Sequence, residues 1–264
     1  MKPYSIILAS ALALCACTQI RTDYEKYDLN CKAREVSLQS DKMEFPYTAW
    51  FNGVGQLDSV ITFNFDGSFR SRETYSYGSR NRLEEIVCIN SENETEARYE
   101  YEIDGKFVRE CRIYGMNNQE IHRWTHRNDG RHILTSEYYG EGEFQYKTEK
   151  TFNGNHYTEK SYNPDGELLG SAEVDFYKTE TKPSRIVGDD LDVEIKYNEK
   201  GLPVECRNVV LNSLGELEWI ADLEINPKRF YTYEYDERGN WISRAERVHP
   251  DSAAVAVLRR TIVY

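Results

Sequence analysis

The 264-residue chain lacks any hydrophobic run long enough to cross a membrane as a helix. Its longest weakly polar to apolar stretch, residues 4–14, falls well short of the roughly 20 residues that a transmembrane helix needs. Beyond residue 17, apolar side chains show no sustained three-and-four spacing of the kind that marks an amphipathic helix. These two absences exclude a membrane-spanning helix and a helical domain.

The chain also lacks the motifs of common catalytic and metal sites. No two cysteines form a CxxC pair, which argues against a zinc site built on cysteine. A glycine-rich phosphate loop, a nucleophile elbow and a cysteine–histidine pair with family spacing are missing as well. We therefore predict no catalytic residue, no metal ligand and no cofactor. The four cysteines outside the N-terminal region leave three disulfide pairings or four free thiols open: Cys31, Cys88, Cys111 and Cys206.

Two clusters of polar residues have the composition of metal sites but the wrong spacing. His122 and His126 belong to a segment that alternates like a strand, on which the imidazoles lie about 13 Å apart. We predict exposed strand histidines there. Asp190, Asp192 and Glu194 share one strand face and lack the glycine and loop spacing of a calcium-binding hand, so we predict a solvated face.

Basic residues are scarce relative to acids: 33 lysines and arginines accompany 45 aspartates and glutamates, for a net charge of −12. This balance argues against nucleic acid as a partner and against a chain that lies on an anionic membrane surface. With so many acids, carboxylate pairs at the spacing of a glycan hydrolase occur by chance. An enzyme is therefore less favoured than a binding or structural protein.

The N-terminus carries an export signal. One lysine, an apolar stretch and a small residue before the cleavage point describe a secretory signal peptide over residues 1–16. Residues 14–17, Leu-Cys-Ala-Cys, resemble the bacterial lipobox, in which the last cysteine is lipid-modified and becomes the first mature residue. We predict lipidation of Cys17 and a membrane anchor in the cell envelope. The outer membrane is the expected location, with its periplasmic and surface sides both open.

The rest of the chain repeats one pattern: aromatic residues alternate with polar ones, and a turn of Asp, Asn and Gly follows. Alternation places one set of side chains on each face of a strand, and Asp-Gly turns supply the positive φ of tight hairpins. With one turn about every 11–14 residues, the pattern predicts an all-β, antiparallel meander of roughly 14–16 strands. Clear copies of the pattern are residues 63–69, 99–107, 124–130, 162–168, 197–202 and 233–241.

We expect this meander to form a large, twisted, curled sheet, because several strands carry charge on both faces and leave only a narrow core. A closed barrel is the competing architecture. Residues 17–26 are expected to be the lipidated cysteine and a tether, and residues 27–264 the β-meander domain.

Residues 235–241, Tyr-Asp-Glu-Arg-Gly-Asn-Trp, resemble the YD repeat of Rhs-type proteins, whose core is Tyr-Asp-x-x-Gly followed by a polar and a large apolar residue. Residues 65–69, 162–168 and 197–202 look like degenerate copies. The start of the domain is similar to that of YD-repeat lipoproteins of Bacteroidetes. In large Rhs proteins such repeats spiral into a hollow shell, and for a chain of this length the resemblance implies an open curved sheet.

Aromatic residues are abundant, with 20 Tyr and 4 Trp, and they are the one compositional feature that points to a function. Tyr and Trp on a sheet can stack on sugar rings or anchor a protein, which makes Tyr233, Tyr235 and Trp241 the candidate binding residues. We expect a binding or structural module for an envelope protein or glycan. A barrel that binds a small apolar ligand and an envelope glycan hydrolase are the alternatives.

Overall fold

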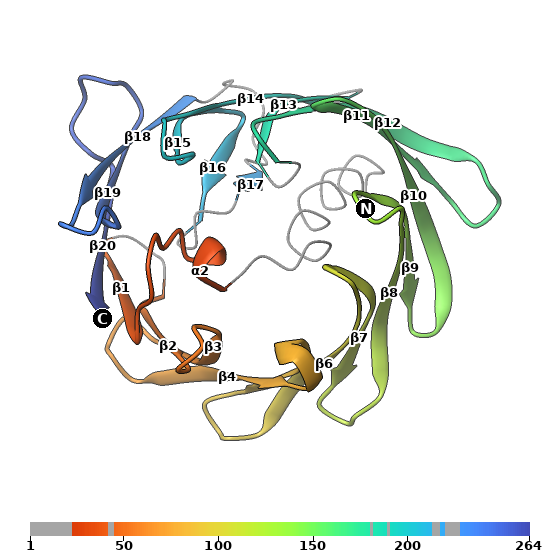
Figure 1. Cartoon of the computed structure of the whole chain (residues 1–264), viewed down its shortest axis with the longest axis horizontal. Helices are drawn as coiled ribbons and strands as arrows, with labels where there is room; N and C mark the ends of the chain where they lie inside the picture. Colours follow the sequence, from red (N-terminus) through yellow and green to blue (C-terminus); the bar gives the residue numbers. More distant parts are fainter. Residues whose placement is uncertain (1–22, 42–44, 180–181, 189–190, 213–216, 220–227) are drawn as a thin grey trace.

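The computed structural model describes residues 23–41, 45–179, 182–188, 191–212, 217–219 and 228–264. The predicted signal peptide, residues 1–16, and Cys17 lie outside the described residues. Strands dominate, and they stand side by side in a ring (Figure 1). No helix in the described part of the chain is long and apolar enough to span a membrane. The elements are α2 (Asp23–Lys26), the 3-10 turn η1 (Ser79–Asn81), β1 (Glu35–Ser40), β2 (Tyr47–Phe51), β3 (Leu57–Phe63), β4 (Phe69–Tyr77), β5 (Leu83–Ile89), β6 (Thr95–Asp104), β7 (Phe107–Gly115), β8 (Glu120–Asn128), β9 (Ile133–Gly140), β10 (Glu143–Asn153), β11 (His156–Tyr162), β12 (Leu168–Phe176), β13 (Pro183–Gly188), β14 (Leu191–Tyr197), β15 (Pro203–Arg207), β16 (Val209–Leu211), β17 (Leu217–Trp219), β18 (Lys228–Tyr235), β19 (Trp241–Arg247) and β20 (Ala256–Val263).

The main sheet is a closed, antiparallel barrel of 18 strands. Strands that follow one another in the chain pair with one another, except that β15 pairs directly with β18 and the β16–β17 hairpin stays apart. The last strand, β20, pairs with β1 and closes the ring (Figure 1). The prediction of an all-β antiparallel meander is confirmed. Of the two architectures considered, the closed barrel is observed, and the open curved sheet implied by the resemblance is not.

One five-residue turn recurs between strands of the described chain. The N–H of its first residue donates to the C=O of the fifth, and the N–H of its fourth donates to the C=O of the first. The fourth residue has a positive φ, as at Gly239 (80°), and the Asp236 carboxylate accepts the backbone N–H of Asn240. Glycine and asparagine tolerate this φ, which is why the Asp/Asn-x-x-Gly signal specifies the turn. These turns begin at residues 52, 64, 90, 115, 163, 198 and 236.

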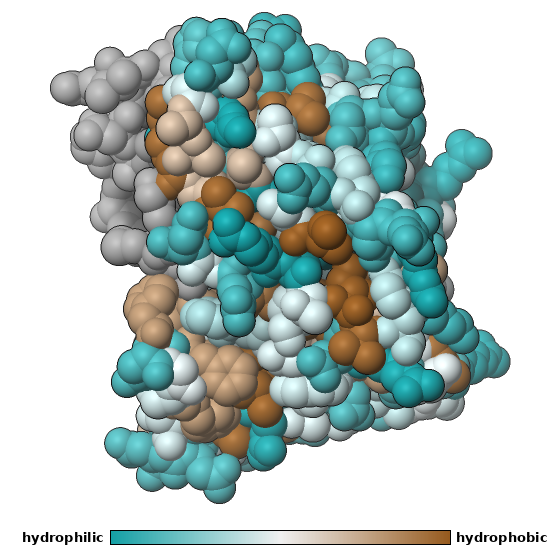
Figure 2. Space-filling view, turned by 90° about the vertical axis from the view of Figure 1, so that its left-hand side faces the viewer, coloured by the Kyte–Doolittle hydropathy of each residue, from teal (hydrophilic) through white to brown (hydrophobic). Residues whose placement is uncertain are grey.

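The outer face of the barrel carries charge in the middle of its strands. Glu100 on β6 lies opposite Arg112 on β7, on the face away from buried Cys111. Ion pairs join Arg98 to Glu100 and Arg112 to Glu110. Figure 2 shows one side of the barrel, where hydrophilic residues separate the hydrophobic ones. Because a lipid-facing Arg or Lys costs about 2–4 kcal/mol at the bilayer midplane, this wall is suited to water and not to lipid.

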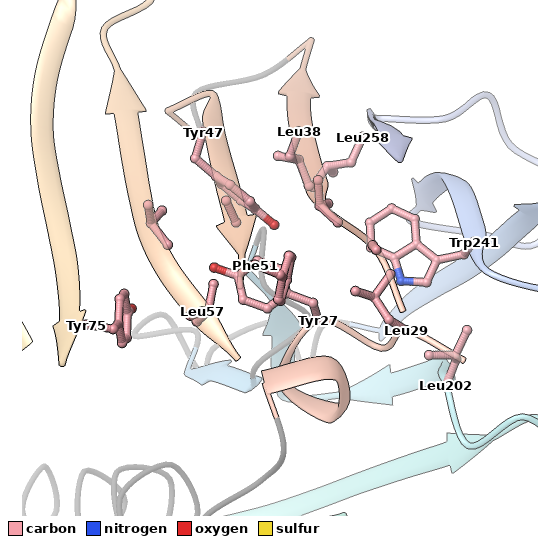
Figure 3. Packing of buried hydrophobic residues seen from close by; sticks show 14 residues of the cluster. Tyr27, Leu29, Leu38, Tyr47, Phe51, Leu57, Tyr75, Leu202, Trp241 and Leu258 are labelled. Atoms are coloured by element: carbon pink, nitrogen blue, oxygen red, sulfur yellow. The ribbon is translucent and has the colours of Figure 1, made fainter. Parts of the chain in front are cut away.

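Two clusters of buried side chains occupy part of the barrel interior. Residues 23–33, which include α2, lie inside the ring and pack against β1–β4, β19 and β20 (Figure 1, Figure 3). A second cluster joins β11–β15 and β18 to the β16–β17 hairpin, which also lies inside the ring. Among the described residues, β6–β9 contribute no side chain to either cluster. The inner face of β6–β9 therefore lies outside both clusters, although Cys111 and Ile133 on these strands are buried.

Candidate functional site

Three aromatic side chains form a row across the inner face of β8, β9 and β10. Trp124 lies opposite buried Cys111 on β7, which fixes its side chain on the inner face. Register then places Tyr138 opposite Trp124 and Tyr146 opposite Tyr138. Ring centroids are 4.7 Å apart for Trp124 and Tyr138 and 5.1 Å apart for the two tyrosines. The three rings are half-buried, and we call them the aromatic row.

A row of polar side chains runs beside the aromatic row, two residues further along each strand. Cross-strand pairs join its members in the order His126, Ser136, Thr148 and Ser161. All four side chains are buried, with exposed fractions of 6% or less. A hydrogen bond of 2.8 Å joins His126 Nδ1 to Ser136 Oγ. We call these four residues the polar row.

Three atoms of the polar row have no hydrogen-bond partner among the described residues: His126 Nε2, Thr148 Oγ1 and Ser161 Oγ. Buried polar atoms in folded proteins are nearly always satisfied, because leaving one without a partner costs about 1–3 kcal/mol. These three atoms therefore set this wall apart as a place where hydrogen-bonding capacity is left open.

A buried ion pair borders the polar row on the side away from the aromatic row. Lys150 lies opposite Glu159, with 3.5 Å between Nζ and Oε2. The ammonium also lies over the Tyr157 ring, 4.6 Å from its centroid. Within the described part of β8–β11, Glu159 is the one acidic side chain that register places mid-strand on the inner face. This wall thus offers a single carboxylate, whereas most glycan hydrolases use two.

The imidazole of His126 is neutral at physiological pH. Burial, with a smaller contribution from the charge of Lys150, lowers the pKa of His126 from 6.5 to about 4. One ring nitrogen of a neutral imidazole donates and the other accepts. With the hydroxyl groups beside it, His126 gives the wall both donors and acceptors, which suits an uncharged ligand that bears hydroxyl groups.

The low pKa of His126 predicts a pH-dependent stability. The unfolded chain takes up a proton near pH 6.5 and the folded chain only near pH 4, so stability falls as the pH drops through this window. The expected loss is about 3 kcal/mol by pH 4, at 1.36 kcal/mol per unit of pKa. Urea unfolding at pH 7 and pH 4 measures it, and His126→Asn should remove this part of the loss. The control His249→Asn, at an exposed histidine, should leave the pH-dependent loss of stability unchanged. Equal pH profiles for wild type and His126→Asn would contradict the low pKa of His126.

The three candidate binding residues chosen from sequence lie together on the inner face of β18 and β19. Trp241 is 3% exposed and belongs to the first core cluster (Figure 3). The Tyr233 hydroxyl donates to the C=O of Pro203 at 2.8 Å, and the Asn198 side chain donates to the Tyr235 hydroxyl at 3.2 Å. All three contribute to packing inside the barrel, and their role in binding stays a prediction.

The expectation of exposed histidines at β8 is wrong. His126 is buried and His122 half-buried, because closure of the sheet turns their face inward. His122 Nδ1 and the Tyr138 hydroxyl form a hydrogen bond of 2.7 Å, which ties this histidine to the aromatic row. The expectation of a solvated face on β14 is confirmed for Asp192 and Glu194, which are exposed and pair with Arg207 at 2.9 Å and 3.1 Å. Asp190 lies outside the described residues.

No disulfide joins any of the four cysteines of the described chain: Cys31, Cys88, Cys111 and Cys206. Burial raises the pKa of Cys88 and of Cys206 to about 12 in each case. Cys88 on β5 and Cys111 on β7 are separated by β6. The thiols of Cys88 and Cys206 are therefore protonated at neutral pH, which makes them poor nucleophiles.

Most residues of the aromatic and polar rows cannot be singled out in the sequence. A signal is present, since β8, β9 and β10 each carry an aromatic and a polar residue two positions apart, as at Trp124 and His126. The same step recurs at Ser136 and Tyr138. Only the pairing register shows that these steps line up across neighbouring strands.

No protein-family model matches the chain, and no curated protein matches it. Solved structures similar to it include a porin-like protein from Bacteroides uniformis ATCC 8492, with a TM-score of 0.44 and 11% identity over 87% of this chain and 97% of that one. A porin-like protein from Bacteroides vulgatus ATCC 8482 aligns with a TM-score of 0.30 and 8% identity over 88% of this chain and 98% of that one.

Proposed function

We propose that the protein is a lipid-anchored β-barrel of the cell envelope that binds a glycan on the inner wall of β8–β11. The observation that carries this proposal is the aromatic row beside a polar row with unpartnered buried atoms. Sugar recognition combines these two elements, because an aromatic ring stacks on the C–H face of a sugar while hydrogen-bonding groups take its hydroxyls. The recurring five-residue turns support the resemblance to YD repeats.

The main competing ligand is a small apolar molecule, which the half-buried rings would also accept. The polar row argues against it. An apolar ligand would leave His126 Nε2 and the hydroxyls of Thr148 and Ser161 without partners, at about 1–3 kcal/mol each. A hydroxyl-bearing ligand satisfies them.

Glycan binding should depend on the indole of Trp124. Loss of one stacking ring reduces the free energy of glycan binding by about 1.5 kcal/mol. Trp124→Ala should therefore bind the glycan about tenfold more weakly. A glycan array probed with the 18–264 fragment identifies the ligand. Calorimetric titration with that glycan then measures the change in affinity. Tyr139→Ala is the matched control, because Tyr139 lies next to Tyr138 on the outer face. Absence of any glycan binding, or equal losses in the two variants, would rule out this wall as the site.

The anchor half of the proposal rests on the lipobox-like residues 14–17 and on the charged outer wall, which keeps the barrel itself in water. Lipid attachment adds about 0.8 kcal/mol per buried CH₂, and several acyl chains hold a protein stably at a membrane. Cys17→Ala should therefore move the protein from the membrane fraction to the soluble fraction without detergent. Cys15→Ala is the control and should stay with the membranes. A Cys17→Ala protein that still needs detergent would contradict the anchor.

A further inference from the structure

The exposed charges of the turns are sorted between the two ends of the barrel. In an antiparallel meander every second turn lies at the same end. Lys32 and Arg34, which lead into β1, are exposed at one of these ends, which we call the basic end. Six turns at the basic end each expose one basic side chain: those of Arg80, Lys106, Arg131, Lys178, Lys200 and Arg238. In the described part of these turns the exposed acids are fewer: Asp129, Glu199 and Glu237.

The opposite end, which we call the acidic end, has the reverse composition. Among the described residues its turns and loops expose no lysine or arginine. They expose eight carboxylates: Asp41, Asp66, Glu92, Glu94, Glu141, Asp165, Glu167 and Asp251. The net charge of −12 therefore conceals one end at which basic side chains are in excess.

The two ends act separately on a nearby charged surface. At physiological ionic strength the Debye length is about 8 Å. An eight-residue strand such as β9 is about 26 Å long, and a tilt of about 45° still leaves the two ends about two Debye lengths apart. A surface in contact with the basic end is thus screened from the carboxylates of the acidic end.

Hydrogen bonds link neighbouring turns of the basic end. Lys200 Nζ donates to the C=O of Gly239 at 3.1 Å, from one turn to the next. The side chain of Gln56 donates to the C=O of Asn81 at 2.6 Å in the same way. Asn30, in the segment that packs inside the barrel, also donates to the C=O of Gly239, at 2.6 Å. These contacts hold the turns together as one rim.

Four of the basic side chains on this rim lie over aromatic rings. Lys200 Nζ is 3.7 Å from the ring centroid of Tyr235, and the guanidinium carbon of Arg238 is 3.8 Å from that of Tyr264. The other two lie over the ring of the residue beside them in the sequence: Lys106 and Lys178. An aromatic ring holds a cation in place without cancelling its charge. The charges therefore remain available to an anionic surface.

Residue 23 also lies at the basic end. The Asp23 carboxylate accepts the backbone N–H of Leu57, which directly follows the turn at residues 52–56, at 2.9 Å. Cys17 precedes Asp23 by six residues, and six residues span at most about 22 Å. A lipid on Cys17 would therefore hold the basic end close to the membrane.

We propose that the basic end docks on the anionic headgroups of a lipid bilayer, so that the anchored barrel stands with its acidic end away from the membrane. Each lysine or arginine close to an anionic lipid surface strengthens binding about fivefold. Docking requires only the charges of the rim, whereas the orientation of the anchored barrel rests on the proposed lipidation of Cys17.

The acidic end is the alternative contact with the membrane, because it exposes the apolar side chains of Phe65 and Leu168. Each of them lies next to an exposed acid, Asp66 or Glu167. Anionic headgroups repel these carboxylates, which favours the basic end.

Sedimentation with lipid vesicles tests the docking on the 18–264 fragment, which contains every described residue and lacks Cys17. The fragment should bind vesicles of phosphatidylglycerol and phosphatidylcholine in equal parts, and not vesicles of phosphatidylcholine alone. Added salt should release it, because the attraction is screened. The triple variant Lys106→Gln, Arg131→Gln and Lys178→Gln should bind about 100-fold more weakly, at fivefold for each charge.

A second triple variant is the matched control, because it removes the same number of positive charges from exposed positions within strands: Arg72→Gln, Lys160→Gln and Arg259→Gln. This control should bind the anionic vesicles about as tightly as wild type. Should the first triple variant fail to fold, Lys106→Gln alone replaces it, with an expected loss of about fivefold.

The docking is overturned if the fragment shows no preference for anionic vesicles, or if the two triple variants weaken binding equally. Binding that survives both high salt and the loss of the three rim charges would assign the contact to the apolar residues of the acidic end, and it would overturn the docking as well. The Cys17 anchor fails separately, since it is measured by fractionation of Cys17→Ala and not by vesicle binding of the fragment.

Discussion

Lys150→Met should destabilise the protein by about 3–5 kcal/mol, because it leaves Glu159 as an uncompensated charge in the barrel interior. Both side chains are almost fully buried, with 5% and 0% exposure, so solvent cannot screen the remaining charge. The variant also loses the cation over the Tyr157 ring. Urea unfolding followed by circular dichroism on the 18–264 fragment measures the effect.

Two further variants separate the charge from the packing. Lys150→Met combined with Glu159→Leu removes both charges and should recover most of the loss, since replacing a whole buried pair by apolar residues is often neutral or stabilising. Lys147→Met changes a lysine on the outer face of the same strand, where its pair with Glu149 is exposed and contributes about 0–1 kcal/mol. A Lys150→Met loss no larger than that of Lys147→Met would mean that the interior pair is hydrated.

The turns of this barrel could be predicted because their cause is local. Asp236 caps the backbone of its own turn and Gly239 supplies the positive φ, so five consecutive residues contain the whole explanation. Strand alternation is local as well, and it correctly places Tyr233 and Tyr235 on one face. These two signals are sufficient for the all-β antiparallel meander.

Closure of the barrel could not be predicted in the same way. The β1–β20 pair joins Glu35 to Val263, at opposite ends of the chain, and it forms only if the twist and tilt of all the intervening strands add up. Closure in turn decides which face is inside. This is why the sequence pattern predicts an exposed His126 whereas the structure buries it, and why the lining of the inner wall can be identified only in the folded chain.

The segment inside the barrel is a second feature that depends on distant contacts. Residues 23–33 contribute Tyr27 and Leu29 to the first core cluster, where they meet strands from both ends of the chain. The sequence pattern assigns residues 23–26 to a tether, because this short polar stretch finds packing partners only when the barrel is closed. The interior contacts, such as the hydrogen bond from Arg260 to the Tyr27 carbonyl, bind the segment to the closing strands.

Trp241→Ala should destabilise the protein by about 3–5 kcal/mol, the usual loss when a large buried aromatic is truncated. Trp241 is 3% exposed, packs edge-on against Tyr233 at 6.3 Å and lies beneath the Arg260 guanidinium, so its loss opens a cavity and removes the ring from a buried charge. Trp241→Phe keeps most of the ring and should lose less than half as much.

Trp50→Ala is the matched control for Trp241. Its indole lies on the outer face of β2 and donates to Glu35 at 3.1 Å, so truncation removes one partly exposed hydrogen bond and some surface packing, for about 1 kcal/mol. Urea midpoints at equal m-values compare the three variants. If Trp241→Ala cost no more than Trp50→Ala, the first core cluster would not be what holds β19 and β20 to the internal segment, and closure of the barrel would have to rest on the β1–β20 hydrogen bonds alone.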